Sequence, residues 1–267
     1  VATTGAEVSK EQHPTLPTTP EEIADTAVRC EAAGAAMIHI HVRDDAGEST
    51  LAVDRVGEVV GLVRERTSLV VQVSTGGAVT DGFEDRLAVL KTQPDSCSLT
   101  MGTVNFGDDV FANPWGFITE LYQATQELGI VPEFELFDIG HAHALRRLLA
   151  EYGPPAGGHV HVDFVMGVPG GMPGDARTLV AALAAMPPEV DSWSATGIGR
   201  ATLPVMLAAL SLGGHLRVGM EDVVTLRRGV PVQHNAELVE RAVALSRLAQ
   251  RSPMSGADAR TFLNVAG

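Results

Sequence analysis

The chain has 267 residues, 45% of them hydrophobic, and a formal net charge of −14 at pH 7. This length allows one barrel-sized domain or two smaller ones, and the acidic balance, with no basic run, excludes general binding of nucleic acid. No apolar segment is long enough to cross a membrane or resembles a secretion signal, and the only cysteines are Cys30 and Cys97. We therefore expect a protein of the reducing cytoplasm.

Short β-rich runs alternate with amphipathic helical stretches along the chain, which is typical of βα units around a parallel sheet. In the first helix, Pro20–Ala33, Thr19 is a favourable N-cap and Gly34 follows the last turn. In chain order the predicted strands are Val1–Thr4, Met37–Val42, Leu69–Ser74, Ser96–Met101, Val131–Phe137, His159–Met166, Asp191–Thr196 and His215–Met220. The predicted helices are Pro20–Ala33, Val53–Arg66, Gly82–Leu90, Pro114–Leu128, His141–Glu151, Asp175–Ala185, Leu203–Leu212 and Ala236–Gln250.

Eight strands, each followed by a helix, match the count and size of a (β/α)8 TIM barrel. We predict that residues 1–267 form one such domain, since no Pro/Gly-rich linker divides them. A doubly wound open sheet is the alternative. Its dinucleotide fingerprint is absent, because the glycine-rich stretch Gly167–Gly174 lacks the G-x-G-x-x-G spacing and comes late in the chain.

Two histidines one residue apart stand near the end of the second predicted strand. Side chains at i and i+2 lie on one face of a strand, so His39 and His41 can point at the same spot. Two neutral imidazoles supply half of a site for zinc or another divalent metal. The alternative is a pair of histidines that form hydrogen bonds inside the barrel.

The carboxyl end of every predicted strand is polar. In a barrel these ends and the loops after them build the active site, and glycines there permit close approach of a ligand to the backbone. Polar loops also serve solubility alone, but their clustering at the ends of apolar strands favours ligand binding. The polar ends are Thr4–Glu7, His39–Asp44, Ser74–Gly77, Thr100–Gly107, Glu133–Asp138, Met166–Gly171, Thr196–Arg200 and Arg217–Asp222.

The last predicted strand supplies a candidate for the third metal ligand. Arg217, Gly219 and Glu221 share one face of this strand, so Glu221 can reach the barrel mouth. Asp222 leaves the strand and can turn toward a substrate, with Arg217 near enough to orient it and to pair with an anionic group. The alternative for Arg217 and Glu221 is a structural ion pair.

Other side chains argue against competing chemistries. His159 and His161 start their predicted strand, about 16 Å from the mouth at roughly 3.3 Å per residue, so we expect them to be structural. The only lysines, Lys10 and Lys91, lie outside the predicted strands, which disfavours a Schiff base. Neither cysteine has a partner histidine at a strand end. Polarisation of a carbonyl oxygen by a metal remains the obvious electrophilic device.

Seven motifs in one order along the chain resemble those of the β-keto acid cleavage enzymes, a family that includes the 3-keto-5-aminohexanoate cleavage enzyme. They are TGAE at Thr4–Glu7, HIHVRD at His39–Asp44, STGG at Ser74–Gly77, GTVNFG at Gly102–Gly107, PEFELFD at Pro132–Asp138, GVPGG at Gly167–Gly171 and RVGMED at Arg217–Asp222.

The resemblance implies a zinc-dependent (β/α)8 barrel that converts a β-keto acid and acetyl-CoA into acetoacetate and a new acyl-CoA by a retro-Claisen route. A metal would favour the enolate that forms when a carboxylate removes the α-proton. The implied zinc ligands are His39, His41 and Glu221. The implied keto-acid pocket consists of Glu7, Ser74, Gly77, Thr103 and Asn105. The implied catalytic residues are Asp222 as the base, Arg217 to grip or orient, and Glu135 to support the charge network.

The resemblance also implies a place for the CoA arm along the glycine-rich loop, at Gly170 and Gly171. Because the global charge is acidic, local arginines such as Arg43 or Arg200 would have to favour CoA docking. One departure from the family pattern is Val223, where an asparagine is expected after the Glu-Asp pair. The first strand is short, so we expect a few native residues before it. A homo-oligomer, dimer or tetramer, is expected from the family.

Two other functions remain open at this point. A metal-dependent hydrolase barrel also uses an H-x-H pair, but such sites usually add a bridging lysine. A non-catalytic barrel that binds an acyl-CoA or a small acid is the second alternative. Metal content distinguishes a metal-free sensor from both enzymes, and a requirement for acetyl-CoA distinguishes the cleavage enzyme from the hydrolase.

Overall fold

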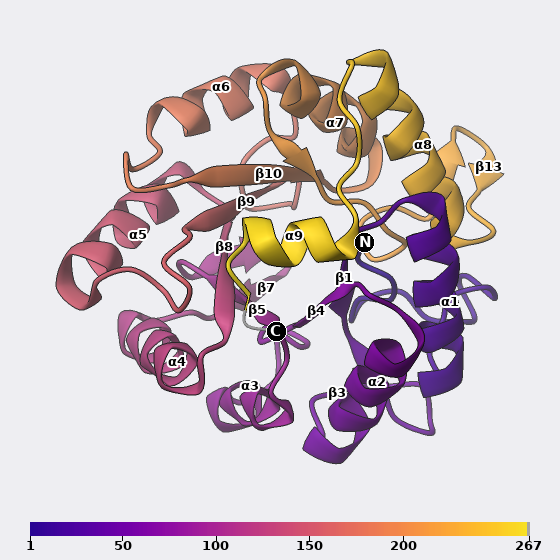
Figure 1. Cartoon of the computed structure of the whole chain (residues 1–267), viewed down its shortest axis with the longest axis horizontal. Helices are drawn as coiled ribbons and strands as arrows, with labels where there is room; N and C mark the ends of the chain where they lie inside the picture. The colour runs from indigo at the N-terminus through magenta and orange to yellow at the C-terminus, as the bar shows by residue number, and fades with distance from the viewer. Residues whose placement is uncertain (266–267) are drawn as a thin grey trace.

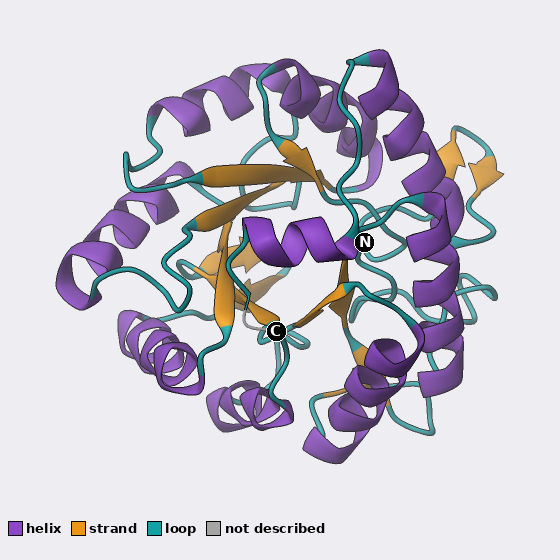
Figure 2. Cartoon of the chain, viewed as in Figure 1, coloured by secondary structure: helices purple, strands orange, loops and turns teal. Residues whose placement is uncertain are grey.

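Seven parallel strands form the main sheet of the computed structural model, which describes residues 1–265. Their spatial order, β1-β4-β5-β8-β9-β10-β11, follows the chain, as expected for consecutive right-handed βα units. The sheet curls around an interior and helices cover its outer face (Figure 1; Figure 2). The strands are β1 (Met37–Ile40), β4 (Val70–Val73), β5 (Ser96–Thr100), β8 (Val131–Leu136), β9 (His161–Met166), β10 (Ser192–Gly197) and β11 (His215–Leu216).

The expected first strand is an isolated bridge and not a strand of the sheet. Ala2 pairs with His39 in parallel and donates its N–H to the carbonyl of Val218 over 2.9 Å, so it lies between the two edge strands. The expected last strand ends at Leu216 and not at Met220. The physical reason is a turn at Gly219, whose carbonyl accepts the N–H groups of the residues three and four positions later. A parallel sheet of seven strands therefore replaces the eight that we predicted.

The helices surround the sheet, and the first two have the bounds predicted from the sequence. At α1 the Thr19 hydroxyl accepts the Glu22 N–H over 3.2 Å and the Glu22 carboxylate accepts the Thr19 N–H over 3.1 Å, which is a capping box. The helices are α1 (Pro20–Ala33), α2 (Val53–Arg66), α3 (Phe83–Ala88), α4 (Trp115–Leu128), α5 (Ile139–Tyr152), α6 (Ala176–Ala184), α7 (Thr202–Ser211), α8 (Asn235–Leu248) and α9 (Gly256–Phe262), with short 3-10 turns η1 (Val89–Thr92) and η2 (Gly199–Ala201).

Helix α9, which the sequence pattern did not predict, crosses in front of the sheet in Figure 1. It packs at the amino end of the strands, where Arg260 donates to the carbonyl of Leu69 over 3.1 Å and to the carboxylate of Asp95 over 2.6 Å. Gly256 approaches so closely that a Cβ there would lie 2.2 Å from the carbonyl oxygen of Ser68. The amino end is therefore covered by the last helix.

Three two-stranded hairpins extend the loops at the carboxyl end of the sheet, and the sequence analysis predicted none of them. They follow β1, β5 and β11 along the chain. Their strands are β2 (Val42–Arg43) with β3 (Ser49–Thr50), β6 (Val104–Phe106) with β7 (Asp109–Phe111), and β12 (Thr225–Arg227) with β13 (Val230–Pro231). The carboxyl end is thus open to solvent but rimmed by structured loops.

Residues of each strand alternate between the helical layer and the inside of the curled sheet. The outward residues are apolar and pack under the helices; they include Ile38, Ile40, Val71, Val73, Leu99, Phe134, Leu136, Val162 and Phe164. The inward residues are polar and bond to one another: His39 with Gln72, Thr100 with Glu135, and Asp163 with Ser194 and Thr196. These bonds offset the cost of burying polar groups.

Candidate active site

Two imidazoles and one carboxylate converge at the carboxyl end of the sheet. His39 lies in β1, His41 follows that strand, and Glu221 lies in the turn after β11. One potential ligand atom from each residue lies within 4.8 Å of the others. His39 Nε2 is 3.8 Å from Glu221 Oε1, and His41 Nε2 is 3.6 Å from Glu221 Oε2. The three residues expected as metal ligands are therefore brought together.

The protonation of the two imidazoles and the free oxygen of Glu221 suit the binding of a divalent cation. Burial lowers the pKa of His41 and lowers the pKa of His39 to about 3, so both imidazoles are neutral at pH 7 and can offer lone pairs. His39 Nδ1 donates to the Gln72 amide oxygen over 2.5 Å, which leaves Nε2 free to bind. Glu221 Oε2 is buried without a hydrogen-bond partner in the described part of the chain. A cation among these atoms would supply that missing partner.

Arg217 is the centre of the charge network. Its guanidinium donates to Glu135 Oε1 over 3.2 Å, to Asp222 Oδ1 over 3.1 Å, and also to Glu221. The ion pair with Glu221 that we considered as an alternative is thus present, but it occupies Oε1 and leaves Oε2 free. Burial favours a raised pKa for Glu221, but Arg217 and the imidazoles lower it to about 2. Glu221 is therefore ionised at pH 7.

The other two carboxyl groups on Arg217 behave differently. Burial raises the pKa of Asp222 to about 7, although Arg217 opposes the shift, and burial likewise raises the pKa of Glu135 to about 7. The Thr100 hydroxyl donates to Glu135 Oε2 over 2.8 Å and holds that side chain in place. A carboxylate with a pKa near neutrality can both take and return a proton, which is the property required of a general base.

A pocket of about 360 Å³ lies above this cluster. The pocket is lined by Glu7, Ser74 and Gly77, which we expected around a substrate. It is also lined by the three expected ligands His39, His41 and Glu221, which we call the metal-ligand group, and by Arg217, Glu135 and Asp222. The remainder of the lining is mostly apolar and includes Val79, Phe106, Phe111, Phe137, Val165, Val168, Ile198, Val223 and Val224.

Two expected substrate residues, Thr103 and Asn105, do not line this pocket. The Thr103 hydroxyl accepts the Asn113 N–H over 2.9 Å, at the base of the β6–β7 hairpin. Asn105 is exposed on β6, and its carbonyl oxygen would lie 2.3 Å from a Cβ at Gly170. Their expected contact with substrate stays a prediction, since both belong to the loop beside the pocket.

The residues expected to contact CoA lie outside the pocket as well. Gly170, at φ +102°, and Gly171 pack tightly against the β6 backbone and the Phe137 carbonyl, which explains the glycines without a ligand. Arg200 is exposed in η2. By contrast Arg43 is 4% exposed and donates to the carbonyls of the loop that carries Glu7, so its guanidinium is not available for CoA.

Arg86 in α3 is a buried residue beside the site that holds two loops in place, and the sequence did not reveal it. It is 3% exposed and donates to the carbonyls of Thr75 over 2.6 Å and Ala112 over 2.8 Å. Its guanidinium also donates to Asn113 and lies 4.8 Å from the ring centroid of Phe111. Arg86 thereby joins the loop after β4 to the β6–β7 hairpin. An arginine in a polar helix carries no sequence signal for such a role.

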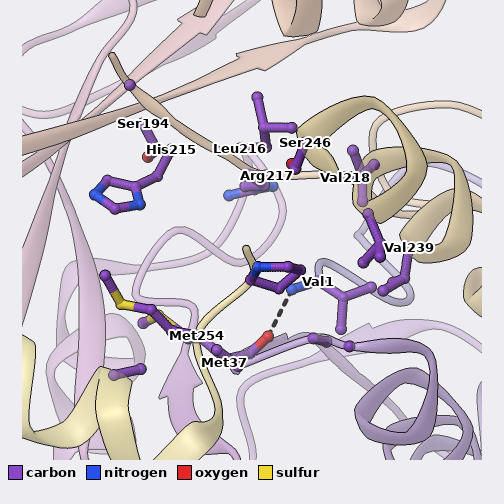
Figure 3. Close-up of a pocket in the computed structure, with 18 of the residues that line it drawn as sticks. Val1, Met37, Ser194, His215, Leu216, Arg217, Val218, Val239, Ser246 and Met254 are labelled. Carbon is purple, nitrogen blue, oxygen red and sulfur yellow. Dashed lines mark hydrogen bonds between the residues drawn. The ribbon is translucent and has the colours of Figure 1, made fainter. Parts of the chain in front are cut away.

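A second cavity, of about 500 Å³, lies at the amino end of the strands (Figure 3). Met37, His215, Val239 and Met254 line it, and the backbone nitrogen of Val1 donates to the Met37 carbonyl over 2.6 Å. Its inner wall reaches His39 and Arg217 from below. His39 and Arg217 therefore border both cavities.

The last H-x-H pair of the sequence, His159 and His161, lies at this amino end. His159 Nε2 and His161 Nδ1 both bond to the Ser192 hydroxyl, over 2.7 and 2.6 Å, and His161 Nε2 lies 3.3 Å from Glu133 Oε2. These contacts confirm that both histidines have structural partners away from the carboxyl end.

Residues 1–265 match the model of the family described as beta-keto acid cleavage enzyme. The chain is 38% identical to the 3-keto-5-aminohexanoate cleavage enzyme of Acetoanaerobium sticklandii, over 98% of this chain and 95% of the relative. It is 34% identical to the 3-oxoadipate:acetyl-CoA acetyltransferase of Cupriavidus necator, over 99% of this chain and 93% of that protein. These matches extend over nearly the whole length of both chains.

Solved structures agree on the fold. The apo structure of ObcA superposes with a TM-score of 0.77 at 21% identity, covering 94% of this chain and 66% of that one. The 3-dehydroquinate dehydratase of Aquifex aeolicus VF5 gives a TM-score of 0.52 at 14% identity, covering 85% of this chain and 93% of that one. Within the described residues, no helix has the length and apolarity required to span a membrane.

Proposed function

The chain belongs to the β-keto acid cleavage enzyme family, and we propose that it cleaves a β-keto acid with acetyl-CoA as co-substrate, releasing acetoacetate and a new acyl-CoA. The observation that carries the proposal is the convergence of a neutral histidine pair, a carboxylate with a free oxygen and an Arg217–Asp222 pair in one pocket. The names of the relatives, which include a cleavage enzyme and an acetyl-CoA acetyltransferase, support the reaction class.

We propose that His39, His41 and Glu221 hold a zinc ion. Two imidazoles and a carboxylate are a donor set that suits zinc and leaves a position for substrate. A zinc ion here would supply a positive charge that polarises the keto group. The bond from His39 to Gln72 supports this assignment, since zinc-bound histidines commonly donate their second nitrogen to a neighbouring acceptor.

Asp222 is the base in this proposal. Its carboxylate removes a proton from the carbon between the keto and carboxyl groups, and that carbon attacks the thioester carbonyl of acetyl-CoA with loss of the CoA thiolate. The thiolate then attacks the original keto carbon. The bond between that carbon and the α-carbon breaks, the new acyl-CoA forms, and the proton on Asp222 returns to the α-carbon to give acetoacetate. Arg217, held by Glu135, keeps Asp222 aimed into the pocket.

The proposed architecture is a closed (β/α)8 barrel in which the first residues complete the ring. The support is that Ala2 donates to Val218 over 2.9 Å while His39 donates to the Val1 carbonyl over 2.8 Å, so both edges of the sheet bond to this segment. Docking of CoA along Gly170 and Gly171 near Arg200, and assembly into a dimer or tetramer, remain predictions from the family.

The metal-dependent hydrolase alternative is disfavoured because no lysine lies in the pocket among the described residues. Lys10 pairs with Glu22 over 2.5 Å, and neither Lys10 nor Lys91 lines the pocket. The bridging lysine typical of such hydrolases therefore has no counterpart in this pocket. The non-catalytic alternative is disfavoured by Asp222. A protein that only binds its ligand does not require a carboxyl group with a raised pKa beside the metal-ligand group.

The test is to incubate the purified, zinc-loaded protein with acetyl-CoA and a panel of β-keto acids, and to measure acetoacetate and the new acyl-CoA by mass spectrometry. We expect both products in equal amounts, formed about a thousandfold more slowly by the Asp222→Asn variant. Absence of acetoacetate across a broad panel, with zinc bound, would contradict the proposed function.

A further inference from the structure

The pocket has an apolar wall that faces the metal-ligand group. Three aromatic rings, Phe106, Phe111 and Phe137, stand edge to face with one another, and each pair of ring centroids is 6.3 Å apart. Val165 and Val168 complete the same buried cluster. This wall, which we call the aromatic wall, is built by the β6–β7 hairpin and by the ends of β8 and β9.

The aromatic wall lies across the pocket from the zinc ligands. The ligands come from β1 and the turn after β11, at the two ends of the strand order, whereas β8 and β9 stand in its middle. In a curled sheet these positions face each other. A β-keto acid whose keto and carboxyl groups lie at the metal-ligand group and Arg217 therefore directs its distal substituent toward the aromatic wall.

Among residues 1–265, no arginine or lysine side chain lines the wall to receive a distal negative charge. Among the described residues that line the pocket, Arg217 is the only arginine or lysine, and its bonds to Glu221 and Asp222 hold it beside the metal-ligand group, across the pocket from the wall. Arg43 and Arg86 lie close by, but both are nearly fully buried and donate to backbone carbonyls. A distal carboxylate would thus be buried without a partner, at a high cost in binding free energy.

A distal positive charge also lacks a suitable partner at the wall. Of the carboxylates that line the pocket, Glu135, Glu221 and Asp222 are held by Arg217, and only Glu7 remains, exposed at the rim and near Arg43. Val223, 6% exposed, stands where the family pattern has an asparagine and adds a hydrocarbon surface to the lining.

Resting on the proposed function, we propose that the substrate is a β-keto acid with an uncharged hydrocarbon substituent, which packs on the aromatic wall formed by Phe106, Phe111 and Phe137. This selects plain aliphatic 3-oxo acids over those that end in a carboxylate or an ammonium group. Burial of methylene groups on the wall stabilises the bound aliphatic substrate. Burial of an unpaired charge destabilises a bound substrate that ends in a carboxylate or an ammonium group.

The first experiment measures kcat/KM of the zinc-loaded enzyme with saturating acetyl-CoA. We expect kcat/KM to rise about fourfold per methylene from 3-oxopentanoate to 3-oxoheptanoate. The matched pair is 3-oxohexanoate and 3-oxoadipate, which have the same number of carbons, and we expect the first to be preferred about a hundredfold or more. 3-Keto-5-aminohexanoate serves as the cationic comparison.

The second experiment places a charge on the wall. Phe106→Arg should lower kcat/KM for 3-oxohexanoate about tenfold and raise it for 3-oxoadipate, because the guanidinium gives the distal carboxylate a partner. Val110→Arg is the matched control, since Val110 is 54% exposed on the same hairpin and does not line the pocket. It should leave both values, and the KM for acetyl-CoA, unchanged.

The outcomes separate this inference from the proposed function. If the wild-type kcat/KM for 3-oxoadipate or 3-keto-5-aminohexanoate equals that for 3-oxohexanoate, the inference is overturned and the proposed function stands. If Phe106→Arg raises only the KM for acetyl-CoA, the wall contacts the CoA arm and the inference is again overturned. If no keto acid in the panel yields acetoacetate, both fail together.

Discussion

Two of the three H-x-H pairs in the sequence lie at opposite ends of the sheet and have different surroundings. At the carboxyl end of the sheet, His39 and His41 lie beside Glu221, whose Oε2, 3.6 Å from His41 Nε2, has no hydrogen-bond partner in the described residues. His159 and His161, at the amino end, share the hydroxyl of Ser192. The comparison teaches that the motif alone does not define a metal site. The end of the strand on which it stands decides which groups surround it.

The largest expected effect separates the two pairs directly. His41→Ala should abolish stoichiometric zinc binding and reduce acetoacetate formation to background, because only two of the three proposed ligands remain. His161→Ala should retain one zinc per chain. Zinc content by atomic emission after gel filtration checks both variants. Loss of zinc from His161→Ala alone would reverse the comparison.

Next in size is the effect of the base. Asp222→Asn should lower kcat by about a thousandfold while zinc stays bound, because the amide cannot accept the α-proton. Asp191→Asn, at the amino end beside Val160, is the control and should leave kcat within a factor of two. Rates by coupled acetoacetate assay check the pair, and comparable rates for both variants would remove Asp222 from the reaction.

A smaller effect is expected from Gln72, whose side chain accepts a hydrogen bond from His39. Gln72→Leu removes the acceptor for His39 Nδ1 and should weaken zinc affinity by about 10- to 100-fold. Competition with a chelator of known affinity measures the change. An unchanged affinity would mean that the bond between Gln72 and His39 serves folding and not metal binding.

The smallest effect concerns the amino end and pH. Burial favours a raised pKa for Glu133, but its bond with His161 and nearby charges lower it to about 2. A carboxyl group with a lowered folded pKa stabilises the fold above its unfolded value near 4.5, and this contribution is lost as pH falls from about 4.5 to about 2. Glu133→Gln should therefore reduce the acid sensitivity of Tm in that range by a few degrees. The same dependence of Tm on pH in the wild type and in Glu133→Gln would contradict a stabilising interaction between Glu133 and His161.

The alternation of strands and helices could be read from the chain because it depends on local patterns. Helix α1 ends at Ala33, just before Gly34, whose φ of +109° suits glycine, and both α1 and α2 have the predicted bounds. Helix α9 and the three hairpins were missed, since each is short. Helix α9 is also stabilised by contacts with distant residues such as Leu69. The length of the edge strands was also misjudged, because the turn at Gly219 depends on the approach of Ala2.

For the site, the sequence by itself determined the residue types and their order: two histidines at strand spacing, an acidic pair after the last strand, and an arginine four positions before that pair. Only the tertiary structure decided which of these groups are free. Arg43 is occupied by backbone carbonyls, Glu221 keeps one oxygen unpartnered, and an aromatic wall faces the ligands. The physical reason is that hydrogen-bond satisfaction and burial depend on neighbours distant in the chain, which no local pattern specifies.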